Sequence, residues 1–418
     1  MNRTKPSVVS AGRLRYTKLI PITYEYGTLL LESVLSAMNR IALKMLFGDR
    51  LKFFTLVAGL TFSALLITQQ GSIFCGLLKR FIVAIENTNV PIWVMDPENR
   101  FIDDVKPLQE TDLYRIRSIG GVGWAMPYLK RLSQVQLPSG KSQNVQLIGY
   151  DSQTLIGLPT TAIIAGNVLD LNSPDAVFVD KKALTKLAAN EDTPATIGSV
   201  FEMEDKRARI VGIVDVANGF QSFPQVMTTY DRAKTYMPPQ RKMLSYVLVS
   251  PQDNQDPEEL AERITKQTGL LALTQEQYIT RTLDYFVHNT GIPINFGITV
   301  MLGVLIGAAV SAQTFYTFTI ENLKQFATFK AMGASSGVLV RMILLQALTV
   351  GLIGYGIGVG LASLFGAMLL RAGTELAYFT PWQLPVLCFF AVVIVCLLSS
   401  LLSIVKVIRL EPAAVFSS

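Results

Sequence analysis

Few residues in this sequence have the type and spacing that covalent or phosphate chemistry requires. Gly140-Lys141-Ser142 looks like the end of a phosphate-binding Walker A loop, but the earlier glycine of that motif would fall at Val135. The residues on either side alternate in the manner of two hairpin strands, whereas the motif needs a strand followed by a helix. We therefore interpret this stretch as a β-turn and expect no nucleotide site in it.

Metal and nucleophile sites are equally difficult to build from this composition. His288 is the only histidine, so the chain alone holds neither a histidine-based metal triad nor a Ser-His-Asp triad. Cys75, Cys388 and Cys396 all fall within apolar runs, where a small buried side chain is the ordinary interpretation. We expect no enzyme activity, no metal and no cofactor in this chain.

The polar segment 319–335 is the candidate for binding chemistry. It is short, carries three charged residues and lies between two long apolar runs. Its apolar residues recur at helical spacing, and a glycine stands where a helix would stop. We interpret it as the place where a cytoplasmic partner grips the membrane part. The residues assigned to this contact are Glu321, Lys324, Phe326, Ala327, Lys330, Ala331, Met332 and Gly333.

The elements around this segment are membrane helices. Half of the residues are hydrophobic and 16% are charged, which is too apolar for an ordinary soluble protein. A helix needs about 20 apolar residues to cross a bilayer. Four runs qualify, at 53–78, 294–320, 342–370 and 384–405, and none contains Asp, Glu, Lys, Arg or His. We expect four transmembrane helices, of which the third begins slightly earlier, at 338.

The charges are divided unevenly along the chain. Residues 79–293 carry 22 basic and 25 acidic residues, whereas the rest of the chain carries 15 basic and 6 acidic ones. Basic loops next to membrane spans are typical of the cytoplasmic side. The net charge of +6 therefore indicates orientation in a membrane and does not indicate nucleic-acid binding. We expect both termini to be cytoplasmic and 79–293 to be extracytoplasmic.

The two ends of the chain flank this arrangement. Residues 38–52 place apolar side chains among basic ones, which predicts an interfacial helix that leads into the first span. Residues 1–37 form a cytoplasmic extension of uncertain status: either Met38 is the biological start, or 1–37 is a loosely attached helix. Residues 406–418 are expected to be a cytoplasmic tail.

The extracytoplasmic region 79–293 has the pattern of an α+β domain. Short β-rich runs bounded by turn residues alternate with amphipathic helical stretches such as 257–268. We expect two subdomains, with residues from about 130 to 235 inserted into a βα sandwich that the flanking segments form. The domain as a whole is thus inserted between the first and second spans.

Glycines mark the expected packing of the membrane helices. Gly303 and Gly307 are four residues apart in the second span, and Gly354 and Gly358 are four apart in the third. Small residues at this spacing let two helix backbones approach closely. They are candidate helix contacts, either within one subunit or across a dimer.

These features together resemble a known family. The order of one span, a large exported domain and three further spans is similar to the FtsX-like/MacB-type permeases of ABC transporters, over residues 39–418. ENLKQFATFKAMGAS at 321–335 resembles the coupling segment of that family, and IRLEPAAVF at 408–416 resembles its ending. LTQEQY at 273–278, followed by Tyr285 and Gly291, is most similar to the DevC-like branch.

The resemblance implies a role. Two copies would pair in the inner membrane of a bacterium and bind a separate ABC ATPase through 321–335. ATP-driven closure of the ATPase would move the exported domains as levers, in export with a membrane-fusion adaptor. Spans without charged residues agree with this, because ion-coupled transporters usually carry intramembrane acids or bases.

Two further readings of the resemblance stay open. FtsX-type relatives are signalling scaffolds that regulate an exported partner such as a cell-wall hydrolase. A role in releasing lipoproteins would need a lipid-binding face between the spans and the exported domain. The sequence alone does not identify a substrate.

Overall fold

The computed structural model of the chain describes residues 37–188, 194–238, 244–372 and 376–409. The expected extension 1–37 lies outside this set except for its last residue, as does most of the expected tail 406–418. The chain divides into two compact units. Gln70–Ile298 with Gly366–Pro381 form one, here called the inserted unit. The other described residues form the helical unit.

Within the described residues, four helices are long and apolar enough to cross a membrane, as the sequence predicted. They are α2 (Arg50–Thr88), α8 (Ile292–Glu321), α10 (Ser336–Arg371) and α11 (Gln383–Ile408). With 39 residues, α2 is about 58 Å long, whereas a bilayer core is about 30 Å thick. The charges of Lys79 and Arg80 led us to end the span at residue 78. The helix continues because its next apolar residues, Phe81, Val83 and Ile85, are buried in the inserted unit.

In the helical unit, α8, α10 and α11 each pack closely on α2. A Cβ atom at Gly307 of α8 would lie 2.6 Å from Cβ of Ser63, and one at Gly303 would lie 3.0 Å from Leu66. The glycines of α10 are as close: a Cβ at Gly358 would lie 2.6 Å from Cβ of Ala64. Gly354 likewise meets Leu60 and Thr61 of α2, and Sγ of Cys388 in α11 lies 3.6 Å from the carbonyl oxygen of Ala64. These small residues therefore form contacts within the subunit.

A second, shorter helix precedes α2. Residues 37–48 are helical, and the chain breaks at Asp49, whose side chain accepts a hydrogen bond from the backbone N–H of Lys52 at 3.2 Å. This bond satisfies one of the free N–H groups at the start of α2. Gln346 of α10, which is buried, donates to the carbonyl oxygen of Ala42 at 2.8 Å. Helix 37–48 is thus fixed to α10 as well as joined to α2.

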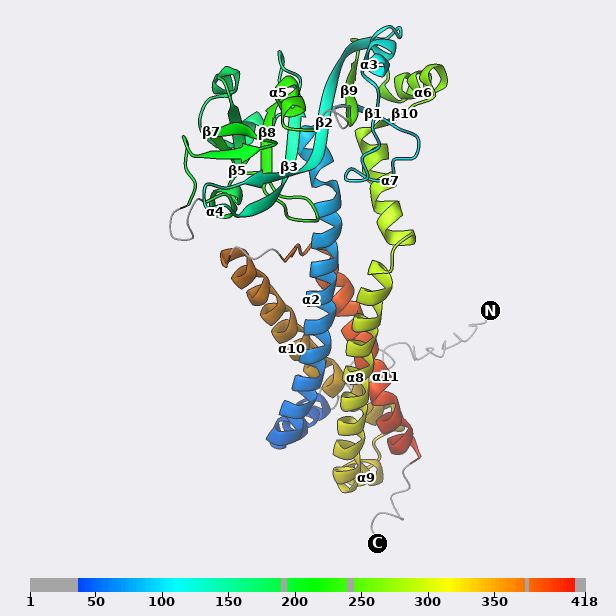
Figure 1. Cartoon of the computed structure of the whole chain (residues 1–418). Coiled ribbons are helices and arrows are strands. Elements are labelled where there is room, and N and C mark those ends of the chain that lie inside the picture. The colour runs from blue at the N-terminus through cyan, green and yellow to red at the C-terminus, as the bar shows by residue number, and fades with distance from the viewer. Residues whose placement is uncertain (1–36, 189–193, 239–243, 373–375, 410–418) are drawn as a thin grey trace, which may run out of the picture. The chain divides into compact units, whose positions relative to one another are not determined.

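The inserted unit is built on one mixed sheet of ten strands (Figure 1). Parallel pairs, β3 with β8 and β5 with β7, lie among antiparallel ones, and β6 pairs with β2 and β7 off the main path. The strand order is β10 (Leu271–Thr274), β1 (Ile92–Met95), β9 (Tyr246–Pro251), β2 (Val122–Gln136), β3 (Ser142–Tyr150), β8 (Gln225–Thr229), β5 (Ala176–Asp180), β7 (Lys206–Val214) and β4 (Ile163–Ala165), with β6 at Val200–Met203.

Both faces of this sheet are buried. In β1, Ile92 and Val94 belong to one hydrophobic core and Trp93 belongs to the other, because successive side chains of a strand point to opposite faces. Helices α3, α5 and α6 contribute to the first core, whereas the end of α2 and α7 contribute to the second. The helices of this unit are α3 (Glu110–Arg117), α4 (Ala183–Lys186), α5 (Tyr230–Thr235), α6 (Pro257–Thr268) and α7 (Gln275–His288), with short 3₁₀ turns at Thr160–Ala162 and Val168–Asn172.

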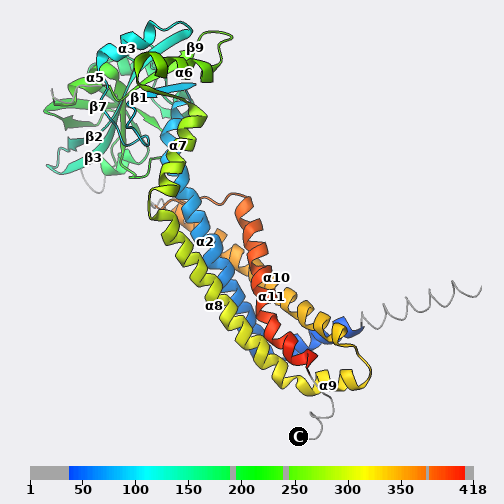
Figure 2. The same cartoon turned by 90° about the vertical axis from the view of Figure 1, so that its right-hand side faces the viewer.

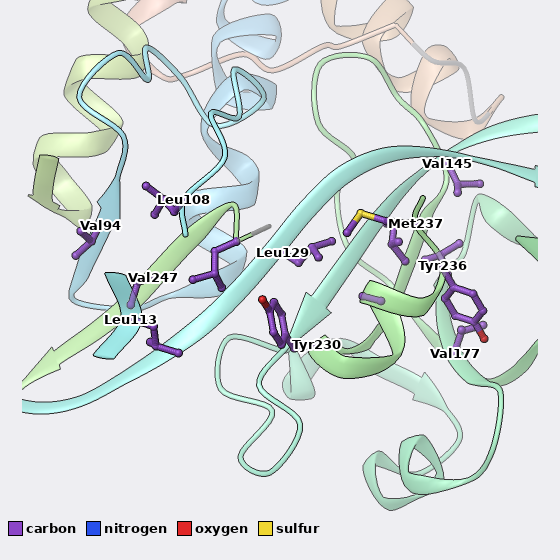
Figure 3. Close-up of a cluster of buried hydrophobic side chains, with 14 of the residues drawn as sticks. Val94, Leu108, Leu113, Leu129, Val145, Val177, Tyr230, Tyr236, Met237 and Val247 are labelled. Atoms are coloured by element: carbon purple, nitrogen blue, oxygen red, sulfur yellow. The ribbon is translucent and has the colours of Figure 1, made fainter. Parts of the chain in front are cut away.

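The predicted insertion is present, and β2 joins the two parts. The first half of β2 pairs with β9, and its second half pairs with β3 and β6. Figure 3 shows Leu129 and Tyr230 between one group of side chains that includes Val94 and Leu113 and another that includes Val177. All of these side chains belong to one buried cluster. The two parts therefore share a sheet and a core.

The stretch that looked like a phosphate loop is the turn between β2 and β3. Gly140 has φ of +79°, a backbone conformation that favours glycine, and its N–H donates to the carbonyl oxygen of Leu137 at 2.8 Å. The two strands pair from Leu129 with Gly149 to Gln136 with Ser142. The hairpin prediction is confirmed.

A buried carboxylate organises one loop of the inserted unit. Asp180, at the end of β5, accepts hydrogen bonds from the backbone N–H of Gln225 and from the side-chain amide of Asn218, both at 2.8 Å. Burial raises the pKa of Asp180 above its usual value, although these two hydrogen bonds oppose the rise. The carboxylate thus ties the loop 218–225 to the sheet.

The contacts of α10 predict unequal effects for two neighbouring glycines. Gly358→Ala should lower the free energy of unfolding by about 1–3 kcal/mol, because its Cβ would overlap Ala64 and Thr61. Gly356→Ala is the matched control: no atom lies within 4 Å of its added Cβ, and alanine favours a helix by about 1 kcal/mol. Thermal unfolding of the purified protein in detergent measures both, and equal melting temperatures would contradict this packing.

The raised pKa of Asp180 predicts a pH dependence. The folded state holds this proton more tightly than the unfolded state, whose Asp has a pKa of about 3.9. The contribution of Asp180 to stability therefore falls as pH rises through its raised pKa. The Asp180→Asn variant lacks this pH-dependent loss of stability. The difference in melting temperature, variant minus wild type, should therefore increase from about pH 4 toward neutrality. A difference that is constant with pH would contradict the assignment.

Candidate coupling site

The polar segment between the second and third membrane helices folds as a short helix, α9 (Leu323–Ala331). It lies between the end of α8 and the start of α10 in the chain, as Figure 2 shows. Asn322 makes the turn into it: its side-chain amide donates to the carbonyl oxygen of Phe318 at 2.8 Å, and its own carbonyl accepts from the N–H of Phe326 at 3.1 Å. One side chain therefore satisfies the end of α8 while its backbone begins α9.

The glycine that was predicted to stop this helix does so. Gly333 has φ of +98°, and its N–H donates to the carbonyl oxygen of Lys330 at 3.1 Å. The next N–H, of Ala334, donates to the carbonyl oxygen of Phe329 at 3.0 Å. These two bonds form a Schellman motif, in which the residue after the helix takes the left-handed conformation. A residue with a side chain would be strained at position 333.

One face of α9 is buried inside the chain. Phe326 and Ala327 are completely buried in a hydrophobic cluster with residues of helix 37–48, α10 and α11. Its other fully buried members are Ala42, Leu339, Met342, Ile343 and Val407. Phe326 was predicted to be one of the residues that contact a partner. In this structure it holds α9 against its own subunit and presents no surface to a partner.

Two of the charged residues are tied to neighbouring helix ends. Glu321 forms an ion pair with Lys52 at the start of α2, and Lys52 also contacts Asp49 at 2.6 Å. Nζ of Lys330 donates to the carbonyl oxygen of Ile408 at the end of α11, at 3.1 Å. A cation at this position satisfies a terminal carbonyl and interacts favourably with the helix dipole. Both residues therefore position α9.

The opposite face of α9 is exposed. Of the predicted contact residues, Lys324, Ala331, Met332 and Gly333 are on the surface, and the side chain of Met332 is 70% exposed. Sequence reasoning missed Gln325 and Thr328, although the three-to-four-residue spacing of Lys324, Thr328 and Ala331 places them on the same side. We call Lys324, Gln325, Thr328, Ala331 and Met332 the exposed face of α9.

The helix ends around α9 are basic. Exposed basic residues occur on helix 37–48, at the starts of α2 and α10, and at the end of α11. Together with Lys324 they favour an acidic surface on any protein that docks here. These residues are Arg40, Lys44, Arg50, Arg341, Lys406 and Arg409.

Among the described residues, no three His, Cys, Asp or Glu side chains cluster as a metal site would require. His288 is exposed at the end of α7 and contacts the carbonyl oxygen of Asp284 at 3.2 Å.

Two family descriptions match this chain. Residues 297–412 match the C-terminal part of FtsX-like permeases, and residues 53–267 match the MacB-like periplasmic core domain. The first match contains α9, α10 and most of α8. The second covers just over half of the chain and contains most of the inserted unit.

Individual relatives are distant. The chain is 24% identical over 313 residues to an uncharacterized ABC transporter permease of Mycobacterium tuberculosis, in strains CDC 1551 and H37Rv, covering 74% of this chain and 79% of the relative. Two solved structures are similar. The periplasmic region of MacB from Actinobacillus actinomycetemcomitans shares 16% identity with a TM-score of 0.35, covering 49% of this chain and 96% of that one. The extracellular domain of the noncanonic transporter YknZ from Gram-positive bacteria shares 13% identity with a TM-score of 0.32, covering 44% and 98%.

The two faces of α9 predict different effects on stability. Phe326→Ala should lower the free energy of unfolding by about 3–5 kcal/mol, because it leaves a cavity in a fully buried cluster. Met332→Ala, six residues along the chain, should change it by less than about 0.5 kcal/mol, because Met332 is exposed. Thermal unfolding of the permease without any partner tests both. A large loss in Met332→Ala, or none in Phe326→Ala, would reverse the assignment of the faces.

Proposed function

Because this chain belongs to the FtsX-like permeases of ABC transporters that carry a MacB-like periplasmic core domain, we propose that it couples a separate cytoplasmic ATPase to movement of its extracytoplasmic domain. The observation that carries this proposal is α9, which is buried on one face and exposed on the other. An ATPase bound to the exposed face of α9 can move the membrane helices only if α9 is firmly attached to them. The buried face of α9 provides that attachment.

The proposed contact is the exposed face of α9. Met332 is the apolar side chain that can enter a pocket on the ATPase, and apolar anchors of this kind contribute most of the affinity of many interfaces. Lys324 and the basic helix ends around α9 would pair with acidic groups at the rim, where charges mainly guide association. Glu321, Phe326, Ala327 and Lys330 serve this contact by positioning it.

The contacts of α9 also provide a route by which its displacement would reach the membrane helices. Glu321 joins it to the start of α2, Lys330 joins it to the end of α11, and Phe326 packs against α10. In turn, α2 runs without a break from Arg50 to Thr88, and its last turns contribute Ile85 to the core of the inserted unit. A tilt or shift of α2 would therefore act on the extracytoplasmic domain directly.

The family match supports a proposal for the wider assembly. We propose export across the inner membrane of a bacterium, with a membrane-fusion adaptor on the extracytoplasmic side and a second permease copy beside this one. Both termini and α9 would then be cytoplasmic, in agreement with the basic residues at that end of the helices. Affinity purification from native membranes distinguishes export from the alternative, a regulatory scaffold. Copurification of an adaptor supports export, whereas copurification of a cell-wall hydrolase supports the scaffold.

Substitutions on the exposed face test the coupling proposal. Met332→Asp should reduce the ATPase activity that the permease stimulates in its partner by at least about tenfold, since a hot-spot residue contributes 2 kcal/mol or more to binding. Leu169→Asp is the matched control, because Leu169 is 72% exposed in the inserted unit and the change is similar. Both variants should keep the melting temperature of the wild type. Full stimulation by a folded Met332→Asp variant would exclude this face from the contact.

A further inference from the structure

The inserted unit contains a cavity of 720 Å³ that the proposed coupling does not use. Its walls come from four places in the chain: the later turns of α2, residues 181–185 at the start of α4, the loop after β7, and residues 369–370 together with 376–379. All of them belong to the inserted unit. The volume lies in the range of about 300–1,000 Å³ that small-molecule sites occupy.

One side of this cavity is basic. Lys79 and Arg80 of α2 line it together with Lys181 and Lys182, and Asp215 is the one acidic residue among its lining residues. Two pairs of adjacent basic residues that are far apart in the sequence thus meet at one cavity. The excess of positive charge favours an anion.

The pair on α2 is unexpected in a membrane protein of this orientation. Basic residues next to a span are enriched on the cytoplasmic side, and Lys79-Arg80 lie at the opposite end of the first span from the basic residues at 40–52. Both side chains are held in place. Lys79 lies over the ring of Phe379 at 4.6 Å, and Arg80 donates to Oγ of Ser222 at 3.0 Å.

The other side of the cavity is apolar. Leu369 and Leu370, at the end of the membrane helix α10, line it together with Leu376 and Phe379. Leu370 is 74% exposed, as expected of a side chain that faces lipid near the end of a span. The cavity therefore has a cationic wall and an apolar wall, and the apolar wall includes the last turn of α10.

We infer that this cavity binds the head group of an anionic phospholipid of the extracytoplasmic leaflet. Its phosphate would lie among Lys79, Arg80, Lys181 and Lys182, and the first carbons of its acyl chains would lie along Leu369 and Leu376. A free phosphate ester offers the same anion without the tail, so the apolar wall is what favours a lipid. The inference goes beyond the coupling role and does not depend on it, because lipid binding requires no ATPase.

Native mass spectrometry of the full chain in a neutral detergent tests this inference. The probe is palmitoyl-oleoyl phosphatidylglycerol, and it is compared with phosphatidylcholine of the same chains and with glycerol 3-phosphate. The test variant is Lys79→Gln/Lys181→Gln, in which both residues are exposed. The control is Lys106→Gln/Lys266→Gln, which removes the same charge from the same unit at residues outside the cavity.

We expect the wild type to bind phosphatidylglycerol more tightly than phosphatidylcholine and to bind glycerol 3-phosphate weakly. The test variant should weaken the tightest phosphatidylglycerol site by about 25-fold, since each of its two basic residues near an anionic head group contributes about fivefold. The control should leave it unchanged, and all variants should keep the wild-type melting temperature. Unchanged binding in the test variant, equal loss in the control, or no preference over phosphatidylcholine would overturn the inference. Glycerol 3-phosphate binding as tight as that of the lipid would overturn the role of the apolar wall.

Discussion

The burial of Phe326 is the interaction on which the position of α9 in this permease depends. A nine-residue helix has little stability of its own in water, since isolated helices of this length are marginal. What keeps α9 folded is the apolar cluster beneath it, to which helix 37–48, α10 and α11 all contribute. A single buried side chain thereby fixes the position of the surface that we assign to the ATPase. The ion pair of Glu321 with Lys52 ties α9 to the start of α2, and the hydrogen bond of Lys330 ties it to the end of α11. Together they fix the orientation of α9.

The apolar helices associate in a different way: their backbones approach one another closely, and no charged side chains of the spans are involved. Lipid is as apolar as leucine, so helices in a bilayer associate through packing of small residues and through occasional hydrogen bonds. Here glycines of both α8 and α10 pack against α2, and Gln346 makes a buried hydrogen bond to helix 37–48. Close packing of α2 on several sides is what the lever role that we propose for it would require.

Sequence patterns predicted the elements well where the pattern and the environment agreed. The four spans follow from apolar runs, and the β2–β3 hairpin follows from alternation around Gly140. The stop of α9 follows from Gly333, whose positive φ is accessible to glycine at little cost. The first span was predicted to end at residue 78, next to the charges of Lys79 and Arg80. The helix itself continues to Thr88, because its later apolar residues are buried in a protein core.

The candidate site was predicted as a segment but not as two faces. Helical spacing groups Phe326 with Leu323 and Lys330, and it cannot say whether that side meets a partner or the same chain. The answer depends on helix 37–48 and Val407, which are distant in sequence and whose position no local pattern reveals. The cationic cavity was missed for the same reason, since Lys79 and Lys181 are brought together only by the fold of the inserted unit.

The central claim is that a cytoplasmic ATPase contacts the exposed face of α9. Site-specific photo-crosslinking in native membranes tests it most directly, with benzoylphenylalanine placed at position 332 and, as a control, at position 169 in the inserted unit. The account predicts a crosslink from position 332 to an ABC ATPase and none from position 169. An ATPase that copurifies with the permease but does not crosslink to position 332, while it does so to a site away from α9, would contradict the account.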